Sequence, residues 1–235
     1  MINNNEVFFT SKADKQLLSK YNLITFNDFW NIENSKFASN FGIETKRSHK
    51  VRGGDTVLRE TCQLNINGET FFLKRSSGKS LNSVKNELNA RKILPNFNLS
   101  SSDYAAYAIN KKTKTAFILM KNLDNFIPCP KLLKLKNENE EYNQYFKDFS
   151  QHLINSFSQI QQSDYFYRDW FVKHLFYNPK TKKIAVIDLE RFYALKDLPF
   201  YYCLKTIKNY KRKKERMILA KTLKISLEYL ESKLS

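Results

Sequence analysis

The chain has 235 residues, of which 42% are hydrophobic, and this size and composition favour a folded protein with one or two compact lobes over a disordered chain. Its formal net charge of +17 indicates an anionic partner such as nucleic acid, an anionic membrane or a phosphorylated substrate, although solvated surface lysines would give the same charge. No apolar run reaches the roughly 20 residues that a membrane-spanning helix needs, and the first residues lack the pattern of a signal peptide.

The cysteines and histidines form no metal-binding or redox motif. Cys62, Cys129 and Cys203 are far apart and odd in number, so we expect reduced thiols in a cytosolic protein. The three histidines do not cluster in sequence, which disfavours a zinc site.

The first strong local pattern is a β-hairpin. Before it, residues 25–30 favour a short helix whose aromatic side chains enter a core. Residues 56–75 then have a β-like texture, with Asn67-Gly68 between the two strand-like runs. A type I′ turn needs positive φ at both central residues, and Asn-Gly supplies it.

A helix and two more strands follow the hairpin. The helix is predicted over residues 80–94, with Ser80 as N-cap and Pro95 as its end. Residues 104–109 and 115–123 are predicted strands. The resulting order β, β, α, β, β is that of a kinase small lobe.

The second half of the chain is predicted to be mainly helical. Residues 131–162 show helical spacing, with one apolar face made by Tyr145, Phe149, Leu153, Phe157 and Ile160. The run 184–187 resembles a buried strand, and the tail from about 200 to 235 is helical and basic.

Asp169 and Asp188 are the most informative residues. Asp169 follows Arg168 in the segment 167–174, and Asp188 ends the apolar run 184–187. A protein-kinase-like fold places a catalytic carboxylate and a metal-binding carboxylate beside one ATP in this way. We therefore expect Asp169 to orient or deprotonate an acceptor hydroxyl, Arg168 to brace the loop, and Asp188 to hold Mg²⁺.

His174 stands five residues after Asp169, where kinases keep a metal-binding Asn. A neutral imidazole can ligate a metal, but Mg²⁺ prefers oxygen, so a hydrogen bond to Asp188 or to a phosphate is the alternative. Glu190 either adds to the metal site or pairs with Arg191.

Lys74 and Glu87 are expected to serve the ATP phosphates. Lys74 lies near the end of the second hairpin strand, from which it can reach the α- and β-phosphates. A buried ammonium needs a carboxylate partner, and Glu87 on the next helix can provide it.

The remaining nucleotide contacts are predicted from position. Gly53 and Gly54 lie in a short glycine-bearing loop whose amides would cover the phosphates. The backbone of Met120-Lys121-Asn122 would contact the adenine as the hinge.

These segments together resemble the lipopolysaccharide core kinase family, which contains the bacterial heptose and Kdo (3-deoxy-octulosonic acid) kinases. The resemblance covers roughly residues 45–195 and rests on the segments 70–75, 86–88, 167–176 and 186–191. The family usually has His where this chain has Tyr167. His174 is familiar from the heptose-kinase branch, whereas Kdo kinases carry Asn, so heptose is favoured as the acceptor.

The resemblance implies an ATP- and Mg²⁺-dependent kinase that phosphorylates a sugar hydroxyl of the lipopolysaccharide inner core or a lipid A-linked acceptor. It also implies a cytoplasmic protein at the periphery of the inner membrane. Residues 189–235 leave no room for a protein kinase's activation segment and peptide-binding floor, which fits a small or glycolipid acceptor.

We therefore predict an α+β, protein-kinase-like two-lobed fold, with an antiparallel-sheet small lobe and a reduced helical large lobe. Residues 1–123 would form the N-terminal segment and ATP-binding small lobe, and residues 124–235 the catalytic large lobe with basic C-terminal helices.

The basic segment 208–216, with six basic residues and one acid, would face an anionic membrane, the phosphates of lipid A or solvent. Nucleic acid is disfavoured because the aromatics form no recognisable nucleic-acid motif. Two alternatives to an active sugar kinase stay open: a kinase-shaped binding protein without catalysis, and a basic binder of membrane or nucleic acid.

Overall fold

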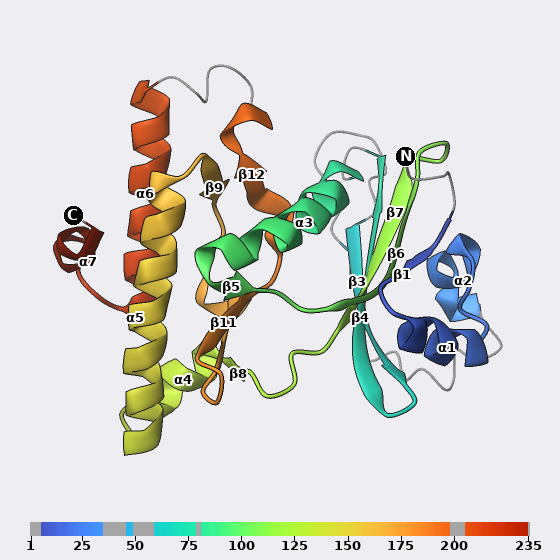
Figure 1. Cartoon of the computed structure of the whole chain (residues 1–235), viewed down its shortest axis with the longest axis horizontal. Coiled ribbons are helices and arrows are strands. Elements are labelled where there is room, and N and C mark those ends of the chain that lie inside the picture. Colours follow the sequence, from blue (N-terminus) through green and yellow to red (C-terminus); the bar gives the residue numbers. More distant parts are fainter. Residues whose placement is uncertain (1–5, 35–45, 49–58, 79–80, 198–204, 235) are drawn as a thin grey trace. The chain divides into compact units, whose positions relative to one another are not determined.

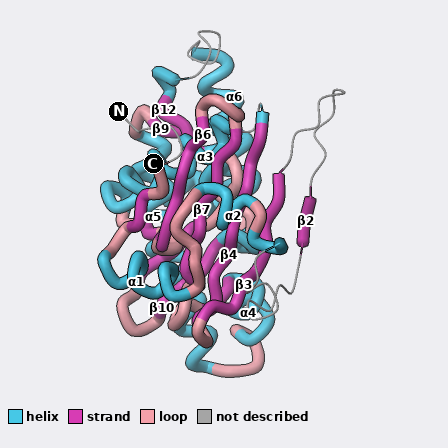
Figure 2. The backbone as a smooth tube through the Cα atoms, turned by 90° about the vertical axis from the view of Figure 1, so that its right-hand side faces the viewer, coloured by secondary structure: helices cyan, strands magenta, loops and turns pink. Residues whose placement is uncertain are grey.

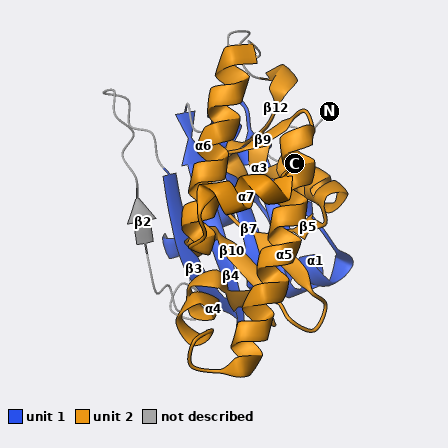
Figure 3. Ribbon diagram, turned by 90° about the vertical axis from the view of Figure 1, so that its left-hand side faces the viewer, with its two compact units in different colours: residues 1–85, 102–123 blue, residues 86–101, 124–235 orange. Residues whose placement is uncertain are grey.

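The computed structural model describes residues 6–34, 46–48, 59–78, 81–197 and 205–234. They divide into two compact units, one of residues 1–85 and 102–123 and the other of residues 86–101 and 124–235 (Figure 3). Each unit is described by itself.

The first unit is built on an antiparallel sheet (Figure 1). In the described residues its strand order is β1-β6-β7-β4-β3-β2. The bounds are β1 Phe8–Phe9, β2 Lys46–Ser48, β3 Arg59–Ile66, β4 Glu69–Ser77, β6 Tyr104–Asn110 and β7 Thr115–Lys121.

The hairpin predicted at Asn67-Gly68 is confirmed. Ile66 pairs with Glu69, and the two turn residues have φ of 56° and 80°. Both values are positive, as a type I′ turn requires. The turn fixes the register of β4, and therefore the face on which each β4 side chain lies.

Two N-terminal helices, α1 (Lys12–Lys20) and α2 (Phe26–Trp30), cover one face of this sheet (Figure 2). Thr25 and Asp28 form a capping box at the start of α2, which stops the helix from fraying. Phe29 stacks on Phe117 of β7, with ring centroids 4.5 Å apart. The short helix predicted over residues 25–30 is thus present, and its aromatic side chains enter the core of this unit.

Arg75 joins this helical layer to the sheet. It is almost fully buried, and its guanidinium binds the carboxylates of Glu33 and Glu60 and the carbonyl of Trp30. Burial alone would lower the pKa of Arg75, but the two carboxylates raise it. The acids beside Cys62 in this cluster therefore neutralise an arginine rather than a metal ion.

The second unit contains two small sheets and most of the helices (Figure 1). One sheet has the order β5-β11-β10-β8, and the other pairs β12 with β9. The strand bounds are β5 Leu99–Ser100, β8 Ile127–Pro128, β9 Tyr165–Tyr167, β10 Leu175–Asn178, β11 Lys183–Val186 and β12 Phe192–Ala194. The helix bounds are α3 Leu81–Ile93, α4 Cys129–Leu135, α5 Glu140–Gln162, α6 Lys205–Leu223 and α7 Leu227–Leu234. The residues of α3 belong to this unit from Asn86 onward.

The helix predicted over residues 131–162 is two helices. α4 ends at Leu135, and Asn139 caps α5 by accepting hydrogen bonds from the amides of Glu141 and Tyr142. Asparagine stabilises helix starts in this way, so a new helix begins there rather than continuing the old one. The predicted apolar face of α5 is buried at Phe149, Leu153, Phe157 and Ile160.

None of the helices in the described ranges is long and apolar enough to cross a membrane.

Candidate active site

The loop between β9 and β10 carries Asp169, whose side chain is buried. The Phe171 amide donates to the Asp169 carbonyl at 2.7 Å, and the His174 amide donates to the Phe171 carbonyl at 2.9 Å. These bonds lead into a short 3-10 helix, Val172–His174. The loop therefore holds Asp169 and His174 in a defined geometry.

Asp188 is the second residue after β11 and lies beside the start of β10. Leu175 pairs with Val186, and the Ile187 amide donates to the His174 carbonyl at 3.0 Å. Asp188 has φ 60° and ψ 53°, a left-handed conformation that costs about 1 kcal/mol for residues other than glycine. Such strain is typical of functional sites.

The His174 ring lies between the two aspartates. Its Nδ1 is 3.1 Å from the Asp169 carbonyl, which can only accept, so Nδ1 carries a proton and donates it. Its Nε2 is 3.7 Å from Asp188 Oδ2, which is longer than a hydrogen bond. A neutral imidazole directs a lone pair from Nε2, and a cation shared with the carboxylate would satisfy both groups. A protonated imidazole would form an ion pair instead.

Arg191 holds the Asp169 carboxylate. Its Nη1 donates to Asp169 Oδ1 at 3.3 Å, and its Nε lies 3.9 Å from a carboxylate oxygen of Glu190. Arg168 is exposed, and no hydrogen bond or ion pair of its side chain occurs within the described ranges. Within the described ranges the contact to the Asp169 carboxylate is therefore made by Arg191, and the loop-bracing role of Arg168 stays a prediction.

Tyr167 lies among the acidic residues of the site. Its side chain is 1% exposed, and its hydroxyl donates to the Ile187 carbonyl at 3.1 Å. Burial raises the pKa of Tyr167 well above its ordinary value, and three nearby carboxylates raise it further, those of Asp169, Asp188 and Glu87. Because electrostatic effects of this kind fall off with distance, the three predicted acids lie near one phenol in the second unit.

Helix α3 brings Glu87 to this cluster. Glu87 is buried, and the side-chain amide of its neighbour Asn86 donates to the Glu190 carbonyl at 3.0 Å. This bond joins α3 to the short 3-10 helix that follows Asp188. The inward orientation expected of Glu87 agrees with its burial.

Helix α6 holds the strand that leads to Asp169. Glu215 is 1% exposed and accepts a hydrogen bond from the Tyr167 amide at 3.0 Å. Arg212 donates to the carbonyls of Ser163 and Tyr165 at 2.9 and 2.7 Å, and to Glu215 at 3.2 Å. Burial raises the pKa of Glu215 to about 7, although Arg212 and the Tyr167 amide lower it in part.

A third contact from α6 reaches the residue after Asp169. The Thr222 hydroxyl donates to the Trp170 carbonyl at 2.6 Å, and both residues are buried. The segment 208–216, expected to face a membrane, a substrate or solvent, also holds the strand before Asp169 through Arg212 and Glu215, which was not predicted. One feature of the sequence could have indicated this role. Glu215 is the one acid in the segment 208–216, and it lies three residues after Arg212, so the two side chains are neighbours on a helix.

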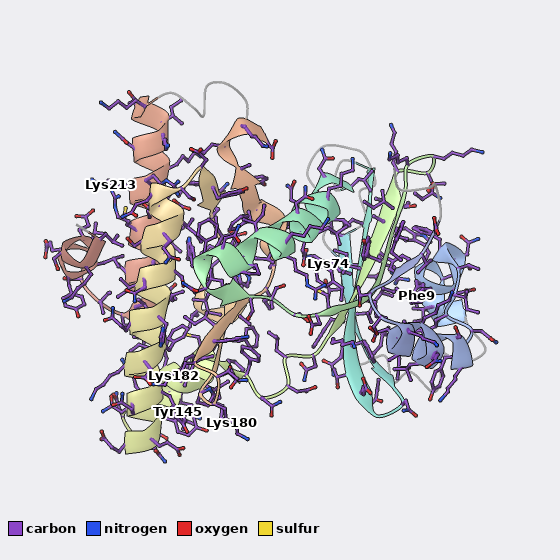
Figure 4. All side chains as sticks on the ribbon, viewed as in Figure 1. Phe9, Lys74, Tyr145, Lys180, Lys182 and Lys213 are labelled. Atoms are coloured by element: carbon purple, nitrogen blue, oxygen red, sulfur yellow. The ribbon has the colours of Figure 1, made fainter. Side chains whose placement is uncertain are left out.

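Lys74 lies on β4 in the first unit (Figure 4). Side chains alternate along a strand, so Lys74 lies opposite the face on which Leu73 and Arg75 meet the N-terminal helices. Phe72 is on the same face as Lys74, and Met120 pairs directly with Phe72 across the ladder. Lys74 and Met120 therefore belong to one face of the sheet.

The predicted hinge, residues 120–122, lies at the end of β7. The Lys121 amide donates to the Asp103 carbonyl at 2.7 Å, and the Asn122 amide donates to the Thr70 carbonyl at 3.0 Å. An adenine contact at Asn122 would therefore use its carbonyl or side chain rather than its amide. Gly53, Gly54 and the predicted cap Ser80 lie outside the described residues.

The comparisons with known proteins identify the fold. The sequence matches no family model and no curated protein. Its structure resembles a solved structure described as WaaP in complex with acyl carrier protein, with a TM-score of 0.54 and 13% sequence identity. The likeness covers 97% of this chain and 98% of that chain. At this identity it shows the fold, and the predicted α+β, kinase-like fold is confirmed.

Proposed function

We propose that this protein is a kinase that transfers the γ-phosphoryl group of ATP to a sugar hydroxyl of the lipopolysaccharide inner core. The observation that carries the proposal is the placement of Asp169 and Asp188 beside one His174 ring on a kinase-like fold: Nδ1 is 3.1 Å from the Asp169 carbonyl and Nε2 is 3.7 Å from Asp188 Oδ2. The lipopolysaccharide acceptor rests on the family that the sequence motifs resemble. His174, in the slot where Kdo kinases carry Asn, favours heptose.

Asp169 would act on the acceptor. As the sugar oxygen forms its bond to the γ-phosphorus, the bond from that phosphorus to the ADP oxygen breaks, and the hydroxyl proton passes to Asp169. The Arg191 contact orients the Asp169 carboxylate, and the Phe171 amide fixes its backbone. A positioned carboxylate is most of what this chemistry needs from the protein.

Asp188 would hold Mg²⁺, with His174 as a second ligand or as a partner of Asp188. Carboxylate oxygen is the ligand that Mg²⁺ prefers, and a bound ion would lie near Asp188 Oδ2 and His174 Nε2, which are 3.7 Å apart. When bound, the ion would neutralise charge on the ATP phosphates. The hydrogen bond from Tyr167 to Ile187 holds the backbone next to Asp188 whether or not the ion is present.

Lys74 would contact the α- and β-phosphates, with Glu87 as its carboxylate partner. Lys74 is buried on the sheet face that also carries Met120, and its ammonium would donate hydrogen bonds to the phosphate oxygens. Met120, Asn122, Gly53 and Gly54 remain the proposed contacts to the adenine and phosphates.

Transfer of radioactive phosphate from γ-labelled ATP to purified lipopolysaccharide acceptors tests the proposal. Deep-rough acceptors that end in heptose or in Kdo would separate the two sugars. Wild type should label the heptose acceptor, and D169A should lose at least about 100-fold in rate, as expected for a general base. Equal rates for the two proteins would reject the proposal.

A kinase-shaped binding protein without catalysis is the second candidate. The observations that favour it are Tyr167 and His174, which depart from the usual kinase residues, and Leu189-Glu190 after Asp188 in place of Phe-Gly. Stabilisation by Mg·ATP without transfer to any acceptor would select this function.

The outward face of α6 supports a location at an anionic membrane. Tyr210 and Met217 are 62% and 54% exposed, and between and beyond them lie exposed lysines at positions 213, 214 and 221. The acid of this helix, Glu215, is buried. Each lysine near an anionic surface contributes about 1 kcal/mol.

Cosedimentation with phosphatidylglycerol vesicles tests this location. A K213Q/K214Q variant should bind more weakly than wild type, and equal binding would reject the α6 face. The WaaP structure contains acyl carrier protein, so a titration with acyl carrier protein in the same variants tests whether that protein binds this face instead.

A further inference from the structure

A pocket of about 280 Å³ opens at the seam of α5 and α6 in the second unit. α6 contributes Lys208, Asn209, Arg212 and Arg216, α5 contributes Ser158, Gln161 and Gln162, and Leu234 of α7 forms one apolar wall. The three basic residues are four positions apart along the helix and therefore form one stripe. This stripe is distinct from the outward face with Tyr210 and Met217.

The lining carries three cations and no carboxylate. Arg212 uses its guanidinium on Glu215 and on backbone carbonyls, and Arg216 has a salt bridge of 3.2 Å to Glu231. Lys208 is half-buried, and within the described ranges its ammonium makes no hydrogen bond or ion pair. Among the described residues, Lys208 therefore supplies a positive charge to the pocket that no described carboxylate neutralises.

Neutral donors lie beside this charge. The Asn209 side chain lines the pocket and forms no hydrogen bond within the described part of the chain. Gln162 makes only a long contact of 3.5 Å to the Ser158 hydroxyl. An ammonium with amide and hydroxyl donors matches the oxygens of a phosphate group.

The volume limits the size of the ligand. At 280 Å³ the pocket is close to the lower limit of small-molecule sites, about 300 Å³. It holds a phosphate with a small polyol, but not a nucleotide triphosphate. The nearby Leu234 side chain suits the carbon skeleton of such a polyol.

We propose that this pocket binds a small phosphate monoester, with Lys208 as the main charge and Asn209 and Arg216 as further donors. The site is separate from the acidic cluster around Tyr167 and does not depend on phosphoryl transfer. Arg212 lines the pocket and also binds the carbonyls of Ser163 and Tyr165, so the site adjoins the segment that leads to Asp169.

Calorimetric titration with glycerol 3-phosphate and with inorganic phosphate, at fixed ionic strength and with EDTA present, tests the inference. Wild type should bind with saturation. K208Q should weaken binding about 10-fold or more, because a charge-assisted hydrogen bond contributes about 1.5–3 kcal/mol. K180Q makes the same charge change at an exposed lysine between β10 and β11, outside the pocket and the α6 face, and should bind like wild type (Figure 4).

Two outcomes would overturn the proposal. Equal weakening in K208Q and K180Q would mean attraction to net charge only. Binding lost in K74M but kept in K208Q would place the phosphate at the proposed nucleotide site. Binding to vesicles that contain phosphatidic acid shows where the phosphate monoester comes from. Lys208-dependent binding to the vesicles but not to glycerol 3-phosphate indicates a lipid phosphate. Binding of glycerol 3-phosphate indicates a free ester. The transfer assay with D169A tests the proposed kinase activity independently. The kinase proposal and the pocket proposal can therefore be rejected separately.

Discussion

The Tyr167 hydroxyl donates a hydrogen bond to the Ile187 carbonyl at 3.1 Å, and this one contact joins the two segments that carry Asp169 and Asp188. Tyr167 is two residues before Asp169, and Ile187 is next to Asp188. The phenol is fully buried and surrounded by carboxylates that keep it protonated, so it stays a donor at any physiological pH. Tyr167 stands where the kinases that the sequence resembles usually have histidine. Its hydrogen bond therefore fixes the position of the Asp188 segment relative to the Asp169 segment.

Replacing Tyr167 with phenylalanine should loosen the Asp188 segment. The change leaves a buried carbonyl without its donor, which costs about 1–3 kcal/mol of unfolding free energy. Phosphoryl transfer should fall more than this loss of folded protein explains, because Asp188 becomes mobile. Urea unfolding and transfer rates would be measured together. Y229F, at a half-exposed tyrosine, is the control, and an equally active Y167F would remove Tyr167 from the mechanism.

Replacing Arg191 with glutamine should reduce the rate of phosphoryl transfer much more than replacing Arg168 with glutamine. R191Q removes the 3.3 Å contact to Asp169 and should reduce the transfer rate at least about 10-fold, since that carboxylate loses its orientation. Stability should change by less than about 1 kcal/mol, because Arg191 is partly exposed. R168Q is the matched control in the same assay. A larger loss of rate in R168Q would restore the role first expected for Arg168.

His174 should affect the response to magnesium. H174A removes a candidate ligand beside Asp188, so a higher Mg²⁺ concentration should be needed for half-maximal transfer. H174N offers an amide oxygen, which Mg²⁺ accepts well, and should restore the wild-type requirement. A magnesium titration of the transfer rate in the three proteins measures this. An unchanged requirement in H174A would mean that His174 only positions Asp188.

Glu215 should make the protein less stable as pH rises from about 4.5 to about 7. Its carboxyl has a pKa of about 7 in the folded protein and an ordinary value of 4.5 in the unfolded chain. The folded state thus binds more protons in this window, and its unfolding free energy falls as they leave, by about 3 kcal/mol at most.

Urea unfolding at several pH values measures this effect, with E215Q as the comparison. The groups that contact the Glu215 carboxylate are Arg212, Gln161 and the Tyr167 amide, and none of them titrates in this window. The difference between the two slopes therefore isolates Glu215. Parallel pH profiles for wild type and E215Q would contradict the assignment.

Local patterns in the sequence predicted the parts of the fold that local chemistry determines. Asn67-Gly68 specifies its turn through backbone φ, and the apolar spacing of α5 specifies its buried face. The break between α4 and α5 was not predicted, because apolar residues have helical spacing on both sides of it. The N-cap Asn139 therefore does not stand out in the sequence. Residue type and spacing in the sequence also pointed to Asp169, Asp188 and Glu87, the three acids that raise the pKa of Tyr167.

Contacts between distant segments were not predictable in the same way. The bonds from Arg212 and Thr222 of α6 to the segment around Asp169 join residues about 50 positions apart. The spacing of apolar residues does not predict contacts between segments so far apart. A basic helix also has the same sequence pattern whether its arginine contacts solvent or a buried carbonyl. The contact from Arg191 to Asp169 was not predictable for a related reason, since it depends on how β12 and β9 bring two loops together.

The most direct test of the central claim measures Mg·ATP affinity and phosphoryl transfer in the same preparations of wild type, D169N and D188N. D169N should bind Mg·ATP like wild type and fail to transfer phosphate, because the acceptor's base is lost while the metal ligand remains. D188N should lose both properties. If D188N binds Mg·ATP as tightly as wild type, or D169N transfers phosphate at the wild-type rate, the roles assigned to the two aspartates are wrong.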